Sequence, residues 1–374
     1  MSDQNEKIAN LPENLKRDVP QLHKDAFSNK QLCLFQTFFA NTEEQQDQVS
    51  NSIELWDSVP RYSISQKAMN KMRDDKGRLD LLTINFLYKQ TKLTAVIQPA
   101  LIREINNGIE STVSYYPSSN EEIVEEALRK IASMQNMGFH EQNKRSGVMF
   151  TLYQLREELS RRGHERNYTQ VVQSLNILSL SIIEITSGDK KNKSFARSAY
   201  FPVLGGVTRE DISEDRNAKW YVQFHPLITE SLDTLTYRQF NYQQLMSHTT
   251  QLARWLHKLI VNKYTFASKV KTFETRFSTI KRDSAMLNNY TRERKAIEAC
   301  DFSMNELVDQ KIISNITREV VTGERKKIMD IIYTLTPTLE FIKEVKAANA
   351  RQGQSDGGFK GRVVEKAVVL RGGS

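Results

Sequence analysis

The chain of 374 residues contains only two cysteines, Cys33 and Cys300, which lie far apart with no CxxC pair and no Cys/His cluster. Disulfide frameworks and structural zinc sites need clustered cysteines, so this scarcity excludes both. Free cysteines suit a reducing compartment. We therefore expect a cytoplasmic protein that holds no metal ion.

Membrane spans and export signals are also missing. No apolar run approaches the roughly 18 residues that a membrane-spanning helix needs. The first residues, MSDQNEKIANLPEN, are acidic and polar, unlike a secretory signal peptide. We expect a soluble protein with no membrane partner.

The motifs of two enzyme classes are absent as well. There is no GxxxxGK[ST] loop, so no nucleotide-hydrolysis signature is present. DNA-nicking enzymes of the relaxase type need two histidines separated by one residue plus a nucleophilic tyrosine, and the six histidines include no such pair. We predict no catalytic residues, no cofactor and no enzymatic activity.

Positive charge is present, and it is concentrated in one stretch. The formal net charge of the chain is +8 and its pI is about 9.2. From Arg254 to Lys295 there are eleven Lys and Arg against three Asp and Glu, so this stretch alone carries a net +8 and the remainder is balanced. Such a surplus indicates an anionic partner.

The same region, Ser247 to Ile313, has the pattern of a helix, a turn and a second helix. Apolar residues at three- and four-residue spacing predict a helix over 247–264, with Ser247 as its N-cap. A short helix follows at 278–286, then a polar turn at 287–289. A longer helix over 290–310, capped by Asn289, buries one side. The buried side is formed by Ile297, Cys300, Met304 and Leu307.

Three basic residues, Arg292, Arg294 and Lys295, lie in the first turns of that longer helix. Positive charge there opposes the helix dipole and costs roughly a few tenths of a kcal/mol. A recognition helix whose N-terminal end enters the major groove of DNA favours this placement. The alternative is an ordinary solvated basic face.

The remainder of the chain divides into further segments. Residues 1–50 are polar and are expected to form a flexible arm, and residues 51–115 are β-rich, with a hairpin over 79–88 and 93–97. Helices are predicted to begin after Asn120, at Thr151 with a capping box to Gln154, and near Asn167. Strands follow at 180–186, 195–203 and 219–224, and residues 351–374 are expected to form a disordered tail.

Three helices followed by a strand, a loop and a strand form the winged-helix arrangement, and this order occurs twice. The first unit spans 116–235, with Lys190–Lys193 at its wing tip. The second spans 236–350, with wing strands at 316–321 and 325–335, and Gly323 is expected to supply a positive φ to their turn. The predicted fold class is α+β, with two tandem winged-helix domains behind a flexible N-terminal arm.

An apolar island, Gln31-Leu32-Cys33-Leu34-Phe35, interrupts the arm. It resembles the pentapeptide by which many bacterial replication proteins bind the sliding clamp, with Cys33 in place of the usual Ser or Asp. The resemblance implies that Gln31 bonds at the rim of the clamp pocket while Leu32, Leu34 and Phe35 make the apolar contact. The alternative is an edge strand that packs on the body of the protein.

Two winged helices in tandem behind such an arm resemble bacterial plasmid replication initiators of the iteron-binding class, the TrfA type in particular. At residue level the resemblance also rests on the segments FTLYQL (150–155) and YRQF (237–240). It implies a protein that binds direct repeats in double-stranded DNA at a plasmid origin and opens the adjacent AT-rich region. The implied partners are the host sliding clamp, the host helicase and the host initiator.

The resemblance also assigns roles to the two units. The C-terminal unit reads bases, while the N-terminal unit contacts the DNA backbone and serves in homodimer formation. Carried onto this chain, the readers of base edges or flanking phosphates are Asn289, Arg292, Arg294 and Lys295. The phosphate contacts are Lys281, Arg282, Arg325, Lys326 and Lys327. The candidates in the first unit are Arg161, Arg162, Arg166, Tyr168 and Gln170. A sequence-specific transcriptional repressor, of its own gene for example, is the alternative function.

Overall fold

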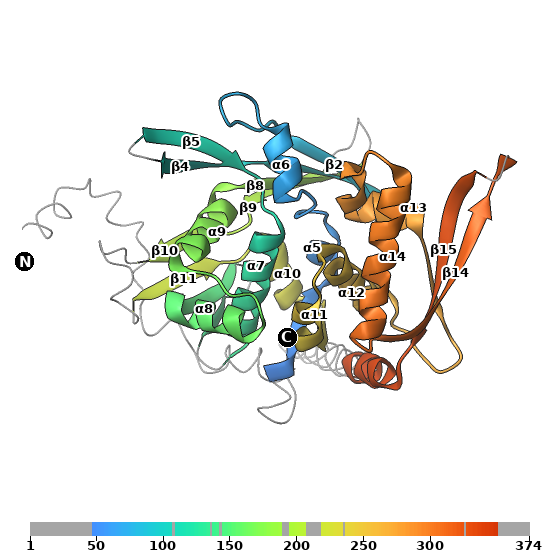
Figure 1. The fold of residues 1–374 in the computed structure, drawn as a ribbon. Coiled ribbons are helices and arrows are strands. Elements are labelled where there is room, and N and C mark those ends of the chain that lie inside the picture. Colours follow the sequence, from blue (N-terminus) through green and yellow to red (C-terminus); the bar gives the residue numbers. More distant parts are fainter. Residues whose placement is uncertain are drawn as a thin grey trace, which may run out of the picture.

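The computed structural model describes residues 47–106, 109–134, 137–141, 144–188, 194–206, 218–234, 236–324 and 327–350. The pentapeptide 31–35, the wing tip 190–193 and the tail 351–374 lie outside these residues. Two units stand side by side, the first green and the second yellow to red in Figure 1. One cluster of buried apolar side chains runs through both, from Ile53 to Val345. The predicted α+β class with two tandem units is confirmed, and the units share a core.

The segment before the first unit does not form a body of its own. Its elements are β1 (Val49–Ile53), α5 (Glu54–Ser58), α6 (Gln66–Met72), β2 (Leu82–Tyr88), β3 (Thr91–Gln98), β4 (Ala100–Asn106) and β5 (Ile109–Tyr115). The predicted hairpin is confirmed as β2–β3, and its two turn residues, Lys89 and Gln90, have φ values of 45° and 67°. The flexible arm was expected to reach residue 50. This boundary is wrong, because Val49 and Ser50 already belong to β1.

The first unit contains three central helices. Its elements are α7 (Ser119–Ala132), β6 (Gly138–Glu141), β7 (Arg145–Thr151), α8 (Leu152–Arg161), α9 (Tyr168–Leu180), β8 (Ile182–Ser187), β9 (Ser194–Ala199), β10 (Val203–Gly206), β11 (Lys219–Gln223) and α10 (Pro226–Asp233). Its strands divide between two sheets, of order β2-β3-β8-β9 and β10-β11-β7-β6. The segment before the unit is therefore built into it through the pairing of β3 with β8.

Capping residues set where these helices begin. The predicted box of Thr151 and Gln154 is confirmed, with backbone-to-side-chain bonds of 2.8 and 3.1 Å. The helix predicted to begin near Asn167 is α9, and Asn167 is its N-cap. The prediction of Asn120 as the cap of α7 is wrong, because Ser118 and Glu121 form a capping box two residues earlier. Asn120 has no Glu or Gln three residues further on that could form such a box.

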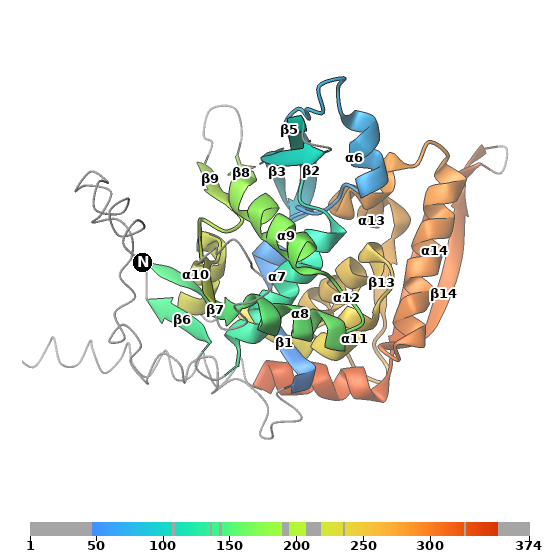
Figure 2. The same ribbon diagram turned by 60° about the vertical axis from the view of Figure 1, so that its left-hand side comes forward.

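The second unit has the complete winged-helix order of elements. They are β12 (Tyr237–Asn241), α11 (Tyr242–Ser247), α12 (Gln251–Lys263), β13 (Phe273–Arg276), α13 (Phe277–Ser284), the 3₁₀ helix η2 (Met286–Asn289), α14 (Glu293–Asp309), β14 (Ile313–Thr322), β15 (Ile328–Pro337) and a last helix over 339–350. The sheet order is β13-β15-β14. The strand β13, which lies between α12 and α13, therefore pairs with the β14–β15 hairpin. Figure 2 shows α14 and β14 side by side at one end of the molecule.

Three local predictions for this unit are wrong. Ser247 is the last residue of α11, and Thr250 caps α12 by accepting the Ala253 N–H at 3.2 Å. Asn289 ends η2 and does not cap α14, which begins after Arg292 without a side-chain cap. Gly323 does not have a positive φ. A Cβ at Gly323 would instead lie 2.8 Å from Cγ of Met329, so this glycine permits a close approach.

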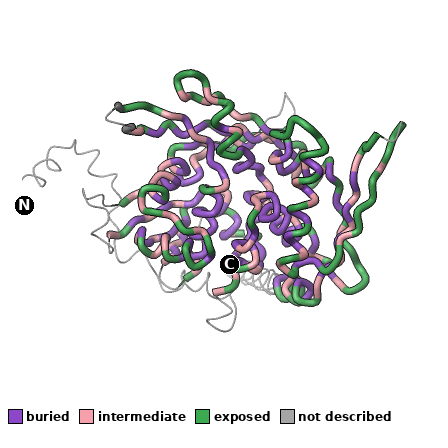
Figure 3. The backbone as a smooth tube through the Cα atoms, viewed as in Figure 1, coloured by how far each residue is buried: buried purple, intermediate pink, exposed green. Residues whose placement is uncertain are grey.

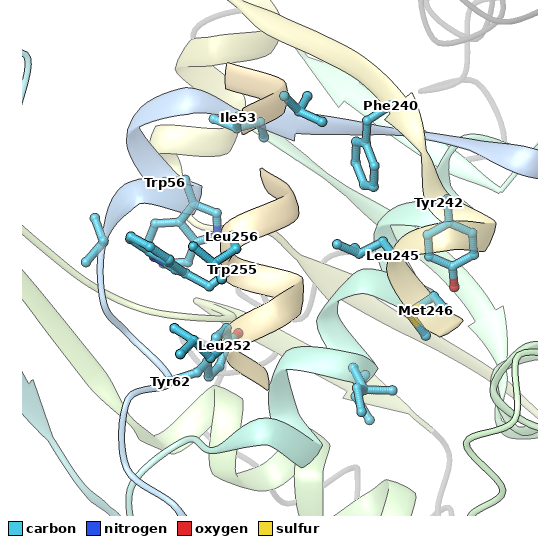
Figure 4. Packing of buried hydrophobic residues seen from close by; sticks show 14 of the residues in the cluster. Ile53, Trp56, Tyr62, Phe240, Tyr242, Leu245, Met246, Leu252, Trp255 and Leu256 are labelled. Carbon is cyan, nitrogen blue, oxygen red and sulfur yellow. The ribbon is translucent and has the colours of Figure 1, made fainter. Parts of the chain in front are cut away.

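Apolar and charged side chains together join the two units. Figure 4 shows Trp56 of α5 packed beside Trp255 and Leu256 of α12. Next to them, the buried carboxylate of Asp57 lies 3.1 Å from Arg61, 2.9 Å from Arg129 of α7 and 3.2 Å from Lys258 of α12. Burial raises the pKa of Asp57, but the charges of Arg129, Lys258 and Arg61 outweigh it and hold this pKa well below its usual value.

Candidate nucleic-acid interface

The N-terminal end of α14 presents a group of basic side chains to solvent. Arg292 is the exposed N-cap residue, and its side chain makes no capping bond. The side chains of Arg294 and Lys295 are 89% and 63% exposed. Both reach Glu298 one turn later, at 3.1 and 2.6 Å, and these bonds lower the pKa of the Glu298 carboxyl. The three candidates therefore lie together and are accessible.

The inner side of α14 explains why this end is held in place. Ile297, Cys300, Met304 and Leu307 are all buried, as predicted. Burial raises the pKa of the Cys300 thiol to about 12, so this cysteine is a packing residue rather than a reactive one. The buried stripe fixes the rotation of the helix and thereby turns its basic first turns outward.

The connection from α13 to α14 places further candidates at the same end. Ala285 adopts φ 57° and ends α13 in the left-handed conformation, after which η2 leads to α14. Asn289 is exposed within this connection. Lys281 lies 3.8 Å from Glu293 of α14, and the exposed Arg282 makes an ion pair with Asp283 at 2.7 Å. Lys281 and Arg282 are accessible but partly engaged by acidic neighbours.

The hairpin β14–β15 forms the wing beside α14. It is anchored to the helix where Arg318 and the Tyr333 hydroxyl both reach Oδ1 of Asp301, at 3.3 and 2.5 Å. Lys327 is exposed at the start of β15. The other two wing candidates, Arg325 and Lys326, lie outside the described residues. Among the described wing residues, Lys327 is thus an exposed basic residue next to β15, while Arg318 is held beside the middle of α14 by Asp301.

Two residues of the basic stretch serve the fold instead. Arg254 is buried against Glu122 of α7, and Lys258 is buried against Glu126 and Asp57. Nine of the eleven basic residues counted in that stretch are therefore left as candidates for a partner. Sequence spacing gave no sign of this, because the acidic partners lie more than a hundred residues away.

The candidates of the first unit are less accessible than those of the second. Arg162 is buried, pairs with Glu158 and Asp47 at 2.9 Å each, and contacts Gln243 of α11. Its prediction as a DNA contact is wrong, since these bonds turn it toward protein. Arg161 is 48% exposed and also pairs with Asp47, at 3.0 Å.

The remaining first-unit candidates lie around the start of α9. Arg166 donates to the side chain of Asn120 at 2.9 Å and to the Glu165 carbonyl at 2.8 Å. The ring of Tyr168 lies under the Arg156 guanidinium, 4.1 Å from its centroid. Gln170 accepts the Asn167 N–H at 3.1 Å in a capping box. Arg161 and Arg166 keep exposed or partly exposed surface, while Gln170 has a structural task.

The third helix of the first unit is also covered, which the sequence did not indicate. Ile177 of α9 packs in a small apolar cluster with Ala100, Ile102 and Tyr115 of the β4–β5 hairpin. A cavity of about 260 Å³ adjoins it, and Gln170, Gln173 and Ser174 of α9 are among its lining residues. The C-terminal half of α9 is therefore covered by the hairpin, whereas Arg292, Arg294 and Lys295 at the start of α14 are exposed.

The described residues lack two kinds of feature. No three His, Cys, Asp or Glu side chains come together in them so as to hold a metal ion. No helix among them is long and apolar enough to cross a membrane.

Known proteins were compared with the chain by sequence and by structure. No family model matches it, and no curated protein matches it in sequence. Two crystal structures of domains 2 and 3 of RctB are similar, with TM-scores of 0.45 and 0.44 and identities of 11% and 10%. They cover 72% and 73% of this chain and 95% and 97% of theirs. A crystal structure of the Pi initiator protein in complex with iteron DNA has a TM-score of 0.40 and 11% identity, covering 59% of this chain and 91% of that one.

Proposed function

We propose that this protein binds duplex DNA through its second unit, with the N-terminal end of α14 in the major groove and the β14–β15 hairpin beside it. The observation that carries this proposal is the exposed group Arg292, Arg294 and Lys295 at the start of α14. This group stands on a unit with the complete winged-helix order of helices and strands. In that arrangement the third helix is the one that enters the groove.

Electrostatics support an anionic partner at this end. Arg292, Arg294 and Lys295 oppose the dipole of α14, at a cost of roughly a few tenths of a kcal/mol each. The helix also begins without a side-chain cap, which leaves first-turn amides able to meet phosphate oxygens. A DNA phosphate both neutralises the basic side chains that oppose the dipole and accepts bonds from the uncapped first-turn amides. Water can accept those bonds but brings no negative charge.

Within this DNA-binding role, we propose that the protein is a plasmid replication initiator of the bacterial cytoplasm. It binds repeated origin sequences, opens adjacent AT-rich DNA, and recruits the host sliding clamp, helicase and initiator without covalent chemistry of its own. The support is the resemblance of the QLCLF peptide and of the tandem units to that class. A division of roles between the units is supported by the exposed start of α14 in the second unit and by the hairpin that packs on α9 in the first.

The experiment uses the full chain and a supercoiled plasmid that carries the DNA flanking its gene. DNase footprinting locates the bound repeats, and permanganate reactivity of thymines reports opening of the neighbouring AT-rich DNA. An initiator gives protection together with opening. Protection without opening, in the presence of the host initiator, favours the repressor. The absence of any protected sequence contradicts DNA binding by the second unit.

A further inference from the structure

One aromatic side chain of α14 lies in solvent. Phe302 is 58% exposed, whereas Cys300 and Met304 on the inner side of the same helix are at most 1% exposed. Figure 3 shows both buried and exposed residues along this helix, which is labelled in Figure 1. Single exposed apolar residues are common on protein surfaces. The case for a role of Phe302 therefore depends on where it stands on the helix.

Helix geometry places Phe302 directly opposite the core. At about 100° per residue, its direction differs by about 180° from the mean direction of the buried stripe of α14 described above. Lys295, Glu298 and Ala299 precede Phe302 by seven, four and three residues. Residues at these spacings share one side of a helix. Phe302 thus lies on the same outer face as Lys295, one of the residues proposed to contact DNA.

Neither packing nor helix propensity explains a phenylalanine at this position. More than half of the side chain is in water, so its burial contributes little to the core. At an exposed helical position Phe is also a poorer helix former than Ala, Leu, Lys or Glu. The fold would be served equally well by a smaller or a polar residue, which indicates that the ring serves contact with a partner.

Neighbouring residues hold this part of the helix in a fixed orientation. Asp301 accepts a bond from the Tyr333 hydroxyl of the wing at 2.5 Å. Glu306, one turn after Phe302, accepts the Thr249 N–H at 2.6 Å. These bonds and the buried stripe set the rotation of α14. The ring therefore projects from a preorganised support, so a partner that meets it does not have to order the helix first.

We propose that Phe302 packs against the C5-methyl group of a thymine in the major groove of the bound duplex. This inference rests on the proposed DNA binding by α14, and it adds a preference for one T·A base pair. The thymine methyl is an apolar group that base pairs present in the major groove, and Phe is one of the side chains that contact it. Continuity of the outer face with Lys295 favours DNA over a protein as the occupant.

The dimensions fit a helix that lies lengthwise in the groove. Seven residues separate Lys295 from Phe302, which is about 10 Å along the helix axis. Successive base pairs rise about 3.4 Å, so the same distance spans about three base pairs. The major groove is about 12 Å wide and admits an α-helix. The thymine is therefore expected about three base pairs from the base pair nearest Lys295.

The test removes single methyl groups from the DNA and the ring from the protein. The full chain first selects a duplex from a random pool. Each thymine of that duplex is then replaced in turn by deoxyuridine, which lacks only the C5-methyl group. The wild type is compared with Phe302→Ala and with Phe302→Leu, which keeps an apolar side chain. The control, Phe195→Ala, removes a ring that is 65% exposed on β9 of the first unit.

For the wild type and Phe195→Ala, we expect deoxyuridine at one position to weaken binding by about fourfold, as for one methyl group removed from an apolar contact. Phe302→Ala should bind the thymine and deoxyuridine duplexes equally at that position, while Phe302→Leu should keep most of the difference. A C·G pair placed there should bind the wild type more tightly when its cytosine carries a 5-methyl group, and Phe302→Ala should not respond. Urea unfolding should give the same midpoint for the wild type and Phe302→Ala, because the ring is exposed.

Two results would overturn the contact with thymine and leave DNA binding in place. One is a wild type that loses no affinity at any deoxyuridine position, and the other is a Phe302→Ala variant that keeps every loss. If that variant keeps the losses but no longer self-associates in sedimentation, the ring belongs to contact between copies of the chain. A wild type that selects no duplex overturns this inference together with the proposed function.

Discussion

The guanidinium of Arg254 on α12 donates to Oε2 of Glu122 on α7 from both Nε and Nη2, at 3.2 and 3.0 Å. Both side chains are buried, and the same guanidinium also donates to the Ser119 hydroxyl at 2.7 Å and to the His248 carbonyl at 3.2 Å. One residue of the basic stretch thus spans the junction of the two units, and its charge is used within the protein.

Replacement of Arg254 by Met should destabilise the protein strongly. The change leaves Glu122 buried without its partner, which typically costs about 3–5 kcal/mol in the free energy of unfolding. Urea unfolding measures it. Arg294→Met is the matched control, because that side chain is 89% exposed and its loss should change the free energy by at most about 0.5 kcal/mol. Equal effects of the two changes would show that the Arg254–Glu122 pair does not hold the junction.

Arg292→Ala and Arg294→Ala should each weaken binding by about 1–3 kcal/mol to the duplex sequence that the wild type selects from a random pool. Each change should also relax the preference of the protein at one base pair of that sequence. Lys327→Ala should weaken all sequences alike and reduce the salt slope by about 1, as expected of a phosphate contact. Binding titrations at several salt concentrations separate the two classes. Arg103→Ala on β4 is the control, because that side chain is 82% exposed, and it should bind as the wild type. If all three variants lost equal affinity for selected and random DNA, the residues that read the base sequence would have to lie elsewhere in the protein.

The carboxyl of Glu344, in the helix over 339–350, gives stability that is lost at higher pH. Burial raises its pKa from 4.5 to about 7, although it accepts the Asn241 N–H at 2.9 Å. Because the folded pKa is the higher one, this stability is complete below pH 4.5 and falls as the pH rises through 7, by at most about 1.4 kcal/mol per unit. Glu344→Gln keeps an acceptor and should remove this decline from urea-unfolding data. An unchanged slope would show that Glu344 titrates normally.

His225 should act in the opposite direction. Burial lowers its pKa to about 4, and the ring stacks on Trp56 with its Nδ1 accepting the Leu227 N–H at 3.2 Å. The unfolded state therefore takes up a proton first, and stability that is complete above pH 6.5 is lost as the pH falls toward 4. His225→Asn retains a capping acceptor and should reduce that acid-side slope by up to about 1.4 kcal/mol per unit. The quantity to compare is the slope of the free energy of unfolding against pH. Loss of the imidazole ring also changes that free energy by a constant amount at every pH.

The cap of α12 can be tested within the chain. Thr250→Ala removes the acceptor of the Ala253 N–H and should cost about 1 kcal/mol in the free energy of unfolding. Ser247→Ala removes only an exposed hydroxyl that donates to the Gln243 carbonyl and should cost at most about 0.5 kcal/mol. A larger cost at Ser247 than at Thr250 would contradict the boundary seen in the structure.

Local patterns predicted most helices and the outward face of α14, because the signals lie within a few residues. The spacing of Ile297, Cys300, Met304 and Leu307 placed the apolar side of α14 and hence its basic side. The capping box at Thr151 is likewise read from four residues. Errors of two or three residues arose in the positions of helix caps, as with Asn120 and Ser118.

Contacts between distant segments could not be predicted in the same way. Residues 121, 122, 125 and 126 of α7 are all glutamates, which a helical pattern assigns to solvent, yet all four are buried. The partners of Glu122 and Glu126 are Arg254 and Lys258, more than a hundred residues further along the chain. Glu125 pairs with Arg61, which lies 64 residues earlier. For the same reason the count of basic residues from Arg254 to Lys295 overstated the DNA-facing charge. The candidates of the first unit likewise included Arg162, whose partners Asp47 and Gln243 come from other segments.

The pairing of β1 with β12 has a mechanical consequence. Residues 1–46 are attached to the body at Asp47, which Arg161 and Arg162 hold, and the chain then enters β1 against the strand that begins the second unit. A force applied to those first residues by any protein that grips them is delivered to the junction, and not to α14 or the hairpin. Tension there would therefore load the pairing of β1 with β12 before it reached the rest of the second unit.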